Sequence, residues 1–241
     1  MTDAQNPTQF SSDGEALWLV PPTHDGQAPG QLFVMFHGQG GEPADLLWLA
    51  RTLQAQWPGA AIMALRAPYP AGVSEAEGRQ WFVADELNAD ELAGQVAAGL
   101  PPLLKLIRRV QAQWQIAPAA TALFGLGQGG LVALELSAAD HALAGRVIAF
   151  SAGYASLPQA AAPETSVHLL HGAEDDVVPP SSSQDAYDRI QELEGDATLD
   201  ILPDIGHELN VALVTRAIER LRTHVPLHIW QSALMSARQS S

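Results

Sequence analysis

The chain has 241 residues, of which 47% are hydrophobic and 16% are charged, and its formal net charge at neutral pH is −15. This composition excludes a disordered chain, and the negative charge disfavours binding to nucleic acid or to an anionic membrane surface. The absence of cysteine excludes disulfides, thiolate metal sites and a cysteine nucleophile. The length suits a single α/β domain with a sizeable core.

The two ends of the chain differ from its centre. Residues 1–14 are polar, residues 231–241 are similar, and both are expected to be flexible tails around a domain over 15–230. The N-terminus lacks a basic start followed by an apolar run, and no apolar run has membrane-spanning length. We therefore expect a cytoplasmic protein that does not insert into membranes.

Short apolar runs predict seven strands: Ala16–Val20, Gln31–Phe36, Ala61–Leu65, Thr121–Gly125, Arg146–Phe150, Ser166–Leu170 and Ala197–Leu202. Helical patterns between them predict five helices: Pro43–Gln56, Ala89–Trp114, Gln128–Ala139, Ser181–Glu194 and Glu208–Thr223. The near-continuous apolar character of the inner runs is typical of parallel strands covered on both faces. The alternation predicts a doubly wound sheet in one domain, with ligands at the carboxyl ends of the strands.

The second predicted helix carries two local signals. Asn88 and Glu91 form a plausible capping box at its start. Pro101 and Pro102 fall inside it and are expected to kink or split it, because proline lacks the N–H that helical hydrogen bonding requires.

The stretch Gly125-Leu126-Gly127-Gln128-Gly129 lies between a predicted strand and a predicted helix. It matches the G-x-S-x-G turn, called the nucleophile elbow, that lifts a nucleophilic serine above a sheet. The residue at the serine position, the apex of the elbow, is Gly127 here. We expect the flanking glycines to be required because a side chain on either would collide with the neighbouring strand or helix. The apex of such a turn has strained backbone angles, which glycine adopts without penalty.

Two other interpretations of these turns remain open. Gly125, Gly127 and Gly130 also fit the dinucleotide-binding pattern G-x-G-x-x-G, although residues 146–148, where an acidic residue is expected, are Arg-Val-Ile. Ser151 stands in a second small-x-Ser-x-Gly stretch after a strand, but the prolines that follow give no helical pattern. We interpret Ser151 as a loop serine and dinucleotide binding as a minor alternative.

Three further loops follow predicted strands. In His37-Gly38-Gln39-Gly40-Gly41, the backbone N–H of Gln39 is placed to form an oxyanion hole together with that of Gln128, the residue after the elbow apex. The loop after the Ser166–Leu170 strand offers Asp175 as a carboxylate that fixes a histidine tautomer. The last strand leads to His207, a candidate general base.

The choice of carboxylate stays open at this point, because Asp176 and Glu174 are neighbours that the sequence does not exclude. The order along the chain is elbow, aspartate, histidine, which is the order of α/β-hydrolase triads. Agreement of all the loops with the strand–helix alternation favours this arrangement over the dinucleotide alternative.

These pieces closely resemble the phospholipase/carboxylesterase branch of the α/β-hydrolases, which includes acyl-protein thioesterase-like enzymes and bacterial esterases. The resemblance covers about Leu17 to Trp230 and rests on FHGQG, GRQWF, FGLGQGG, YASLP, HGAEDDVVP and IGHEL. It implies an α/β-hydrolase fold and hydrolysis of carboxylic esters or thioesters with small or medium acyl chains. It implies no metal, no cofactor and a small-molecule acyl ester as partner.

Carried over residue by residue, the resemblance makes Asp175 the orienting acid, His207 the base, and Gln39 and Gln128 the oxyanion-hole donors. It maps the nucleophile to Gly127, so we expect a carboxylesterase that is catalytically crippled, or else a non-catalytic protein that binds esters. A water positioned by His207 would give only slow hydrolysis. Arg79 and Trp81 lie on a loop expected near the pocket mouth, and packing of Trp81 in the core is an equal alternative. The sequence does not predict an oligomeric state.

Overall fold

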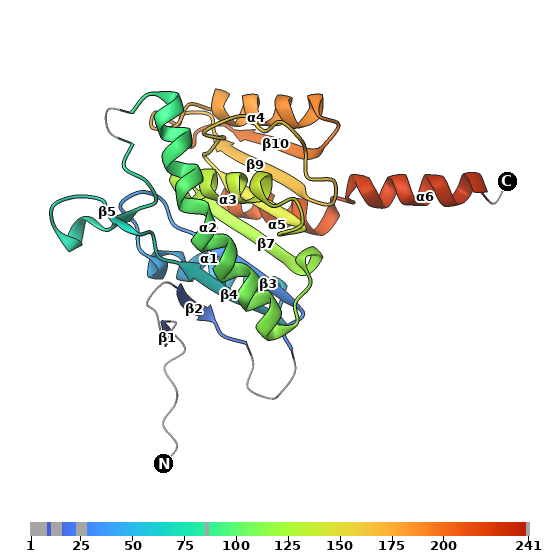
Figure 1. The fold of residues 1–241 in the computed structure, drawn as a ribbon, viewed down its shortest axis with the longest axis horizontal. Helices are drawn as coiled ribbons and strands as arrows, with labels where there is room; N and C mark the ends of the chain where they lie inside the picture. The colour runs from blue at the N-terminus through green and yellow to red at the C-terminus, as the bar shows by residue number, and fades with distance from the viewer. Residues whose placement is uncertain (1–8, 11–15, 23–27, 85–86, 240–241) are drawn as a thin grey trace, which may run out of the picture.

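The computed structural model describes residues 9–10, 16–22, 28–84 and 87–239 (Figure 1). Its centre is an eight-stranded sheet with the order β1-β2-β4-β3-β7-β8-β9-β10. The strands are β1 (Gln9–Phe10), β2 (Ala16–Val20), β3 (Gln31–Phe36), β4 (Ala60–Leu65), β7 (Thr121–Leu126), β8 (Arg146–Phe150), β9 (Ser166–Gly172) and β10 (Asp196–Leu202). The pairs β1–β2 and β2–β4 are antiparallel, and all others in this sheet are parallel. A separate two-stranded ribbon pairs β5 (Tyr69–Pro70) with β6 (Arg79–Gln80).

Helices cover both faces of the sheet. They are α1 (Leu47–Gln56, preceded by the 3₁₀ turn η1, Pro43–Leu46), α2 (Ala89–Trp114), α3 (Gln128–Ala139), α4 (Ser181–Glu192), α5 (Val211–Thr223) and α6 (Leu227–Gln239), with short 3₁₀ turns η2 (Glu75–Glu77) and η3 (Pro118–Ala120). The buried side chains of α2, α3 and α4 join one core cluster, and those of α1 and α5 join the other. The molecule is a single three-layer domain.

The side chains of each inner strand alternate between the two core clusters. In β3, Leu32, Val34 and Phe36 belong to the cluster under α2–α4, whereas Phe33 and Met35 belong to the cluster under α1 and α5. Because successive strand residues point to opposite faces, a strand buried on both sides must be apolar at every position. This confirms the reason given above for the continuous apolar runs.

The seven predicted strands and five predicted helices are all present, with ends that differ by at most three residues. The capping box is confirmed: the Asn88 side chain accepts from the N–H groups of Asp90 and Glu91, and the Glu91 carboxylate accepts from the N–H of Asn88. The pairs β1–β2 and β5–β6 were not predicted, because two-residue strands carry too few positions for a period to show.

The expected splitting of the second helix at Pro101 and Pro102 is wrong, since α2 is continuous from Ala89 to Trp114. Both prolines are exposed, and so are Ala97 and Ala98, whose carbonyls lose their helical donors. Water can hydrate these carbonyls because the residues around them are exposed. The inner face keeps its apolar contacts through Leu100 and Leu106.

The C-terminal segment also differs from expectation. Residues 231–239, for which no helix was predicted, continue helix α6, which extends away from the body of the molecule (Figure 1), and the expected flexibility of this tail stays a prediction. Leu227, Trp230 and Leu234 recur at helical spacing along it and are exposed. At the other end, β1 pairs with β2, and the rest of the 1–14 segment lies outside the described residues. No helix among those described is long and apolar enough to cross a membrane.

Candidate functional site

The turn between β7 and α3 places Gly127 at its apex. Gly127 has φ 54° and ψ −119° and is the N-cap residue of α3. A Cβ on Gly125 would lie 2.2 Å from the carbonyl oxygen of Gly129, and one on Gly129 would lie 2.3 Å from that of Phe36. Both are backbone contacts that cannot give way, so the expectation that the flanking positions require glycine is confirmed.

The imidazole of His207 stands directly over this apex. A Cβ built on Gly127 would lie 3.0 Å from His207 Nε2 and 3.2 Å from its Cε1. A side chain at position 127 would therefore point at the Nε2 edge of the ring. A serine would require the half-buried His207 ring to retreat by a few tenths of an ångström.

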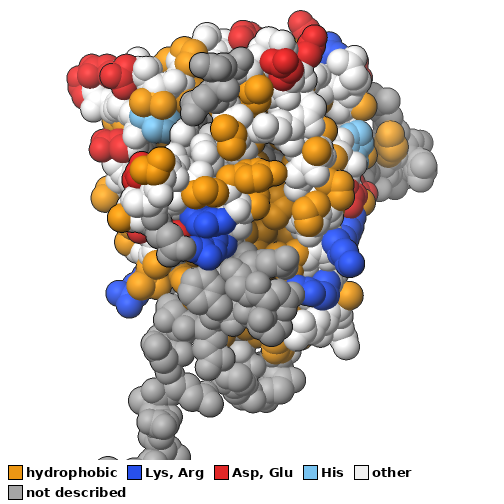
Figure 2. All heavy atoms as spheres, turned by 60° about the vertical axis from the view of Figure 1, so that its left-hand side comes forward, with side chains coloured by type: hydrophobic (Ala, Val, Ile, Leu, Met, Phe, Trp, Pro, Cys, Tyr) orange, Lys and Arg blue, Asp and Glu red, His pale blue; other side chains and the backbone are white. Residues whose placement is uncertain are grey.

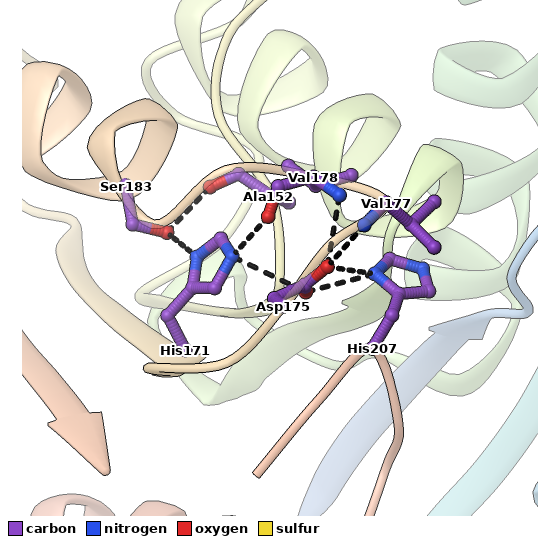
Figure 3. A network of polar contacts seen from close by, with 7 residues as sticks. All are labelled: Ala152, His171, Asp175, Val177, Val178, Ser183 and His207. Atoms are coloured by element: carbon purple, nitrogen blue, oxygen red, sulfur yellow. Dashed lines mark hydrogen bonds and ion pairs between the residues drawn. The ribbon is translucent and has the colours of Figure 1, made fainter. Parts of the chain in front are cut away.

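The opposite edge of the same ring is held by Asp175. His207 Nδ1 lies 2.9 Å from Asp175 Oδ2 and 3.1 Å from Oδ1 (Figure 3). The neighbouring carboxylates of Glu174 and Asp176 are exposed, and the bonds of His207 go to Asp175. Of the three candidates that the sequence left open, the structure brings Asp175 to the histidine.

The contacts of Asp175 favour its ionised form. Burial acts to raise the pKa of Asp175, but the Val178 N–H at 2.8 Å, the Ser151 hydroxyl, His207 and the Val177 N–H at 3.0 Å outweigh it and lower the pKa below its ordinary value. A carboxylate only accepts hydrogen bonds, so the proton of the imidazole lies on Nδ1. The lone pair of Nε2 then faces Gly127.

A second histidine, which the sequence analysis did not identify, also contacts this carboxylate (Figure 3). His171 is fully buried, with Nε2 3.3 Å from Asp175 Oδ2 and 2.9 Å from the Val178 carbonyl oxygen. Its Nδ1 lies 2.7 Å from Ser183 Oγ. Burial lowers the pKa of His171 and favours the neutral ring. His171 lies near the end of β9 and Asp175 in the loop that follows, so their contact depends on how that loop folds, and no local pattern in the sequence signals it.

The loop after β3 meets the elbow through side-chain amides. Gln128 Nε2 donates to Gln39 Oε1 at 3.3 Å, while Gln128 Oε1 accepts from the Trp81 N–H at 2.9 Å. Within the described residues, no acceptor bonds to the backbone N–H of Gln39 or of Gln128. Both N–H groups are therefore free to bind an oxygen, and the one on Gln128 has the positive end of the α3 dipole behind it.

Arg79 and Trp81 hold this region together rather than pointing at Gly127. The Arg79 Nε donates to the Ala67 carbonyl at 2.7 Å, and its guanidinium also bonds to the Pro68 carbonyl. Trp81 is 5% exposed and donates from Nε1 to the His37 carbonyl at 2.8 Å. The packing alternative for Trp81 thus matches its contacts, although both residues also line a cavity.

That cavity has a volume of about 350 Å³ and lies between α2, α3 and the β5–β6 ribbon. Its wall is mainly apolar and includes Tyr69, Phe82, Leu100, Leu103 and Val132. Figure 2 shows hydrophobic side chains gathered on the corresponding face of the molecule, with basic side chains beside them. The Gln128 side chain links the elbow to the wall of this cavity, since it bonds to the backbone of Trp81 and Phe82, which line it.

Two other possibilities have little geometric support. Ser151 is fully buried, with φ 49°, so no substrate can reach its hydroxyl. In the part of the chain that the structure describes, no group of three or more histidine or acidic side chains is placed to hold a metal ion.

Comparison with known proteins identifies the family of the chain. The model of the phospholipase/carboxylesterase family matches residues 23–225. Esterase YpfH of Escherichia coli strain K12 is 34% identical over 208 residues, which cover 86% of this chain and 89% of that protein. The crystal structure of esterase PE8 superposes with a TM-score of 0.73 at 28% identity, covering 85% of this chain and 96% of the other.

A more distant neighbour supports the fold alone. Arabidopsis thaliana SOBER1 has a TM-score of 0.68 at 19% identity and covers 80% of this chain and 99% of its own. The family match spans most of the chain, and YpfH is similar over nearly its full length. This chain therefore belongs to the phospholipase/carboxylesterase family of carboxylic ester hydrolases and has the α/β-hydrolase fold of that family.

Proposed function

We propose that the protein is a carboxylesterase-family ester-binding protein whose serine-dependent hydrolysis is lost, because Gly127 stands at the nucleophile position. The observation that carries this proposal is the 3.0 Å between His207 Nε2 and the position of a Cβ on residue 127. A base directed at the elbow apex, with its other nitrogen on a carboxylate, is the arrangement that activates a serine hydroxyl.

The remaining parts take the following roles in the proposal. His207 is the base, Asp175 fixes its tautomer, and the N–H groups of Gln39 and Gln128 hold the carbonyl oxygen of the ester. The apolar cavity of about 350 Å³ takes the acyl group, and its size suits a small or medium chain. The names of the matched relatives, esterase YpfH and esterase PE8, support an ester as the ligand.

Loss of the serine hydroxyl lowers the rate of ester hydrolysis by a large factor. In subtilisin, which uses the same triad chemistry on another fold, removal of the serine lowers kcat by about 2 × 10⁶ and leaves roughly 10³–10⁴ over water. The oxyanion donors and the binding site supply that residual rate. We expect this chain to hydrolyse activated esters at a comparably small residual rate.

The test is Gly127→Ser, assayed with a short-chain nitrophenyl ester and with a fluorophosphonate probe. We expect covalent labelling and a rate increase on the order of 10³-fold or more over the unaltered chain, which should not be labelled. Gly127→Ala is the matched control, because it adds the same Cβ without the hydroxyl. The double variant Gly127→Ser with His207→Gln should lose the gained activity.

Each outcome separates the candidate functions. If Gly127→Ser folds, binds an uncleavable amide analogue and stays inert, the protein is a binding protein and the hydrolase arrangement of these residues is wrong. If the unaltered chain turns over at ordinary enzyme rates, another nucleophile exists and the site is misplaced. Saturable binding of NAD or NADP would support the dinucleotide alternative instead.

A cytoplasmic location stays a prediction from the sequence.

A further inference from the structure

Gly127 leaves the Nε2 edge of His207 facing the elbow with no side chain between them. A Cβ at this apex would already be 3.0 Å from Nε2, and Gly127 has none. In a serine hydrolase the hydroxyl separates the imidazole from the carbonyl carbon of the substrate. We propose that in this chain His207 itself attacks the ester and carries the acyl group on Nε2. This inference rests on the proposed function, since it needs an ester in the same site.

The contacts of His207 make Nε2 a nucleophile as well as a base. Its Nδ1–H is held by both oxygens of Asp175, at 2.9 and 3.1 Å, so the ring cannot turn that edge away from the carboxylate without losing both contacts. The Asp175 side chain is fully buried, whereas that of His207 is 22% exposed. The lone pair on Nε2 is therefore fixed in direction and open to a ligand. Histidine is one of the side chains that form covalent acyl intermediates.

Attack creates a positive charge on the ring and a negative charge on the carbonyl oxygen, and the site has groups that stabilise each. When Nε2 bonds to the carbonyl carbon, the ring becomes positive, and the Asp175 carboxylate on Nδ1–H stabilises it. The carbonyl oxygen becomes negative and faces the free N–H groups of Gln39 and Gln128 and the N-terminus of α3. Attack requires the carbon to come within about 3–3.5 Å of Nε2, a distance that a side chain on residue 127 would obstruct.

Apart from the ester, the two steps consume only water. The Nε2 lone pair forms the N–C bond, the bond from carbon to the leaving oxygen or sulfur breaks, and its electron pair leaves with that atom. Water then adds to the same carbon, and the N–C bond breaks with its pair returning to Nε2. The water protons go to the departed anion and to solvent. The sum is ester plus water giving acid plus phenol, or thioester plus water giving acid plus thiol.

This route restricts the substrate class. While Nε2 is bonded to carbon, His207 cannot give a proton to the leaving group as it does in a serine hydrolase. The leaving group must therefore depart as a stable anion, such as a phenolate or a thiolate. We infer that the chain turns over aryl esters and thioesters and not alkyl esters. Gly127→Ser, in which the base is free to act as an acid, should accept alkyl esters too.

The experiment is rapid acid quench of the unaltered chain with p-nitrophenyl acetate, S-phenyl thioacetate or ethyl acetate, followed by intact mass and peptide mapping. We expect one added acetyl group on the peptide that contains His207 with the first two esters and none with the third. His207→Gln should abolish it, and Gly127→Ala should lower its rate on the order of 10²-fold by placing a Cβ against Nε2. Binding is followed in every variant by quenching of tryptophan fluorescence with N-(4-nitrophenyl)hexanamide.

The results distinguish this inference from the proposed function. Binding of the amide and slow ester hydrolysis without any acetylated peptide would overturn His207 as nucleophile and leave general-base action on water, with the ester site intact. Acetylation at another residue, or equal rates in Gly127→Ala and the unaltered chain, would also overturn it. Absence of both amide binding and ester hydrolysis would instead reject the proposed function.

Discussion

Gly127 has backbone angles, φ 54° and ψ −119°, that disfavour every residue with a side chain. A serine at such an apex stores about 1–3 kcal/mol of strain, which hydrolases accept because the turn exposes the hydroxyl. Glycine adopts the same turn without that strain. Under the proposal that residue 127 is the nucleophile position, glycine there lacks the hydroxyl but leaves the elbow undisturbed, which is consistent with Asp175 and His207 converging on the apex.

Alanine substitutions at two other glycine sites are predicted to change the free energy of unfolding in opposite directions. At Gly129 a Cβ would meet the carbonyl oxygens of Phe36 and His37 at 2.3 and 2.5 Å. At Gly94 and Gly99, which are exposed residues of α2, a Cβ would meet nothing within 4 Å. Gly129→Ala should lower the free energy of unfolding by about 3 kcal/mol or more, because two backbone segments must separate. Gly94→Ala should raise it by about 0.5–1 kcal/mol.

Urea unfolding followed by circular dichroism measures both alanine variants. Gly99→Ala serves as a second control on the same helix. A Gly129→Ala protein as stable as the unaltered chain would show that β3 and α3 are not packed as tightly as described.

At the scale of elements, the edge formed by β9, β10 and the end of α5 contains a buried histidine that resists protonation. His168 on β9 is fully buried, with Nδ1 2.9 Å from Thr198 Oγ1 on β10, and its ring packs edge-on against His224. Its Nε2 has no partner in the described part of the chain. Burial, followed by the charge of His224, lowers the pKa of His168 from 6.5 to about 3.

This shift predicts a loss of stability in mild acid. Between pH 6.5 and about 3 the unfolded chain binds a proton at residue 168 that the folded chain does not, so the contribution of this group to the free energy of unfolding falls as the pH falls. The slope from this group approaches about 1.4 kcal/mol per pH unit. His168→Gln should flatten the decline between about pH 6 and about pH 4.5 in urea titrations, relative to His228→Gln on α6. Equal slopes in the two variants would contradict the burial of a neutral His168.

The elements also show which sequence signals were sufficient to predict secondary structure. Runs such as Gln31–Phe36 are apolar at every position and long enough to identify, so the parallel core of the sheet could be predicted. Helix α6 was missed because it starts without the acidic or capping residues that mark a helix start, and Asp196 on β10 holds its first N–H instead. That contact joins residues 31 positions apart in the chain and leaves no local trace.

At the scale of the whole molecule, the candidate site could be predicted as far as backbone topology determines it. Parallel strands end at one edge of the sheet, so the loops that carry Gln39, Gly127 and His207 had to lie near one another. The sequence could not choose Asp175 over its neighbours, because that depends on how the turn directs one side chain inward. His171 escaped notice for the same reason: its contact with Asp175 depends on the folded loop.

The charge of the whole molecule gives a further prediction. With 27 acidic against 12 basic residues, like-charge repulsion across the surface outweighs the scattered ion pairs such as Arg66–Glu42. Raising the ionic strength from about 10 mM to about 200 mM shortens the screening length from roughly 30 Å to below 8 Å and should raise the Tm. Near the pI of about 4.7 the same step should change the Tm much less, because the net charge is close to zero there. A Tm at neutral pH that falls with salt would mean instead that local ion pairs, rather than net repulsion, dominate the electrostatic free energy of this fold.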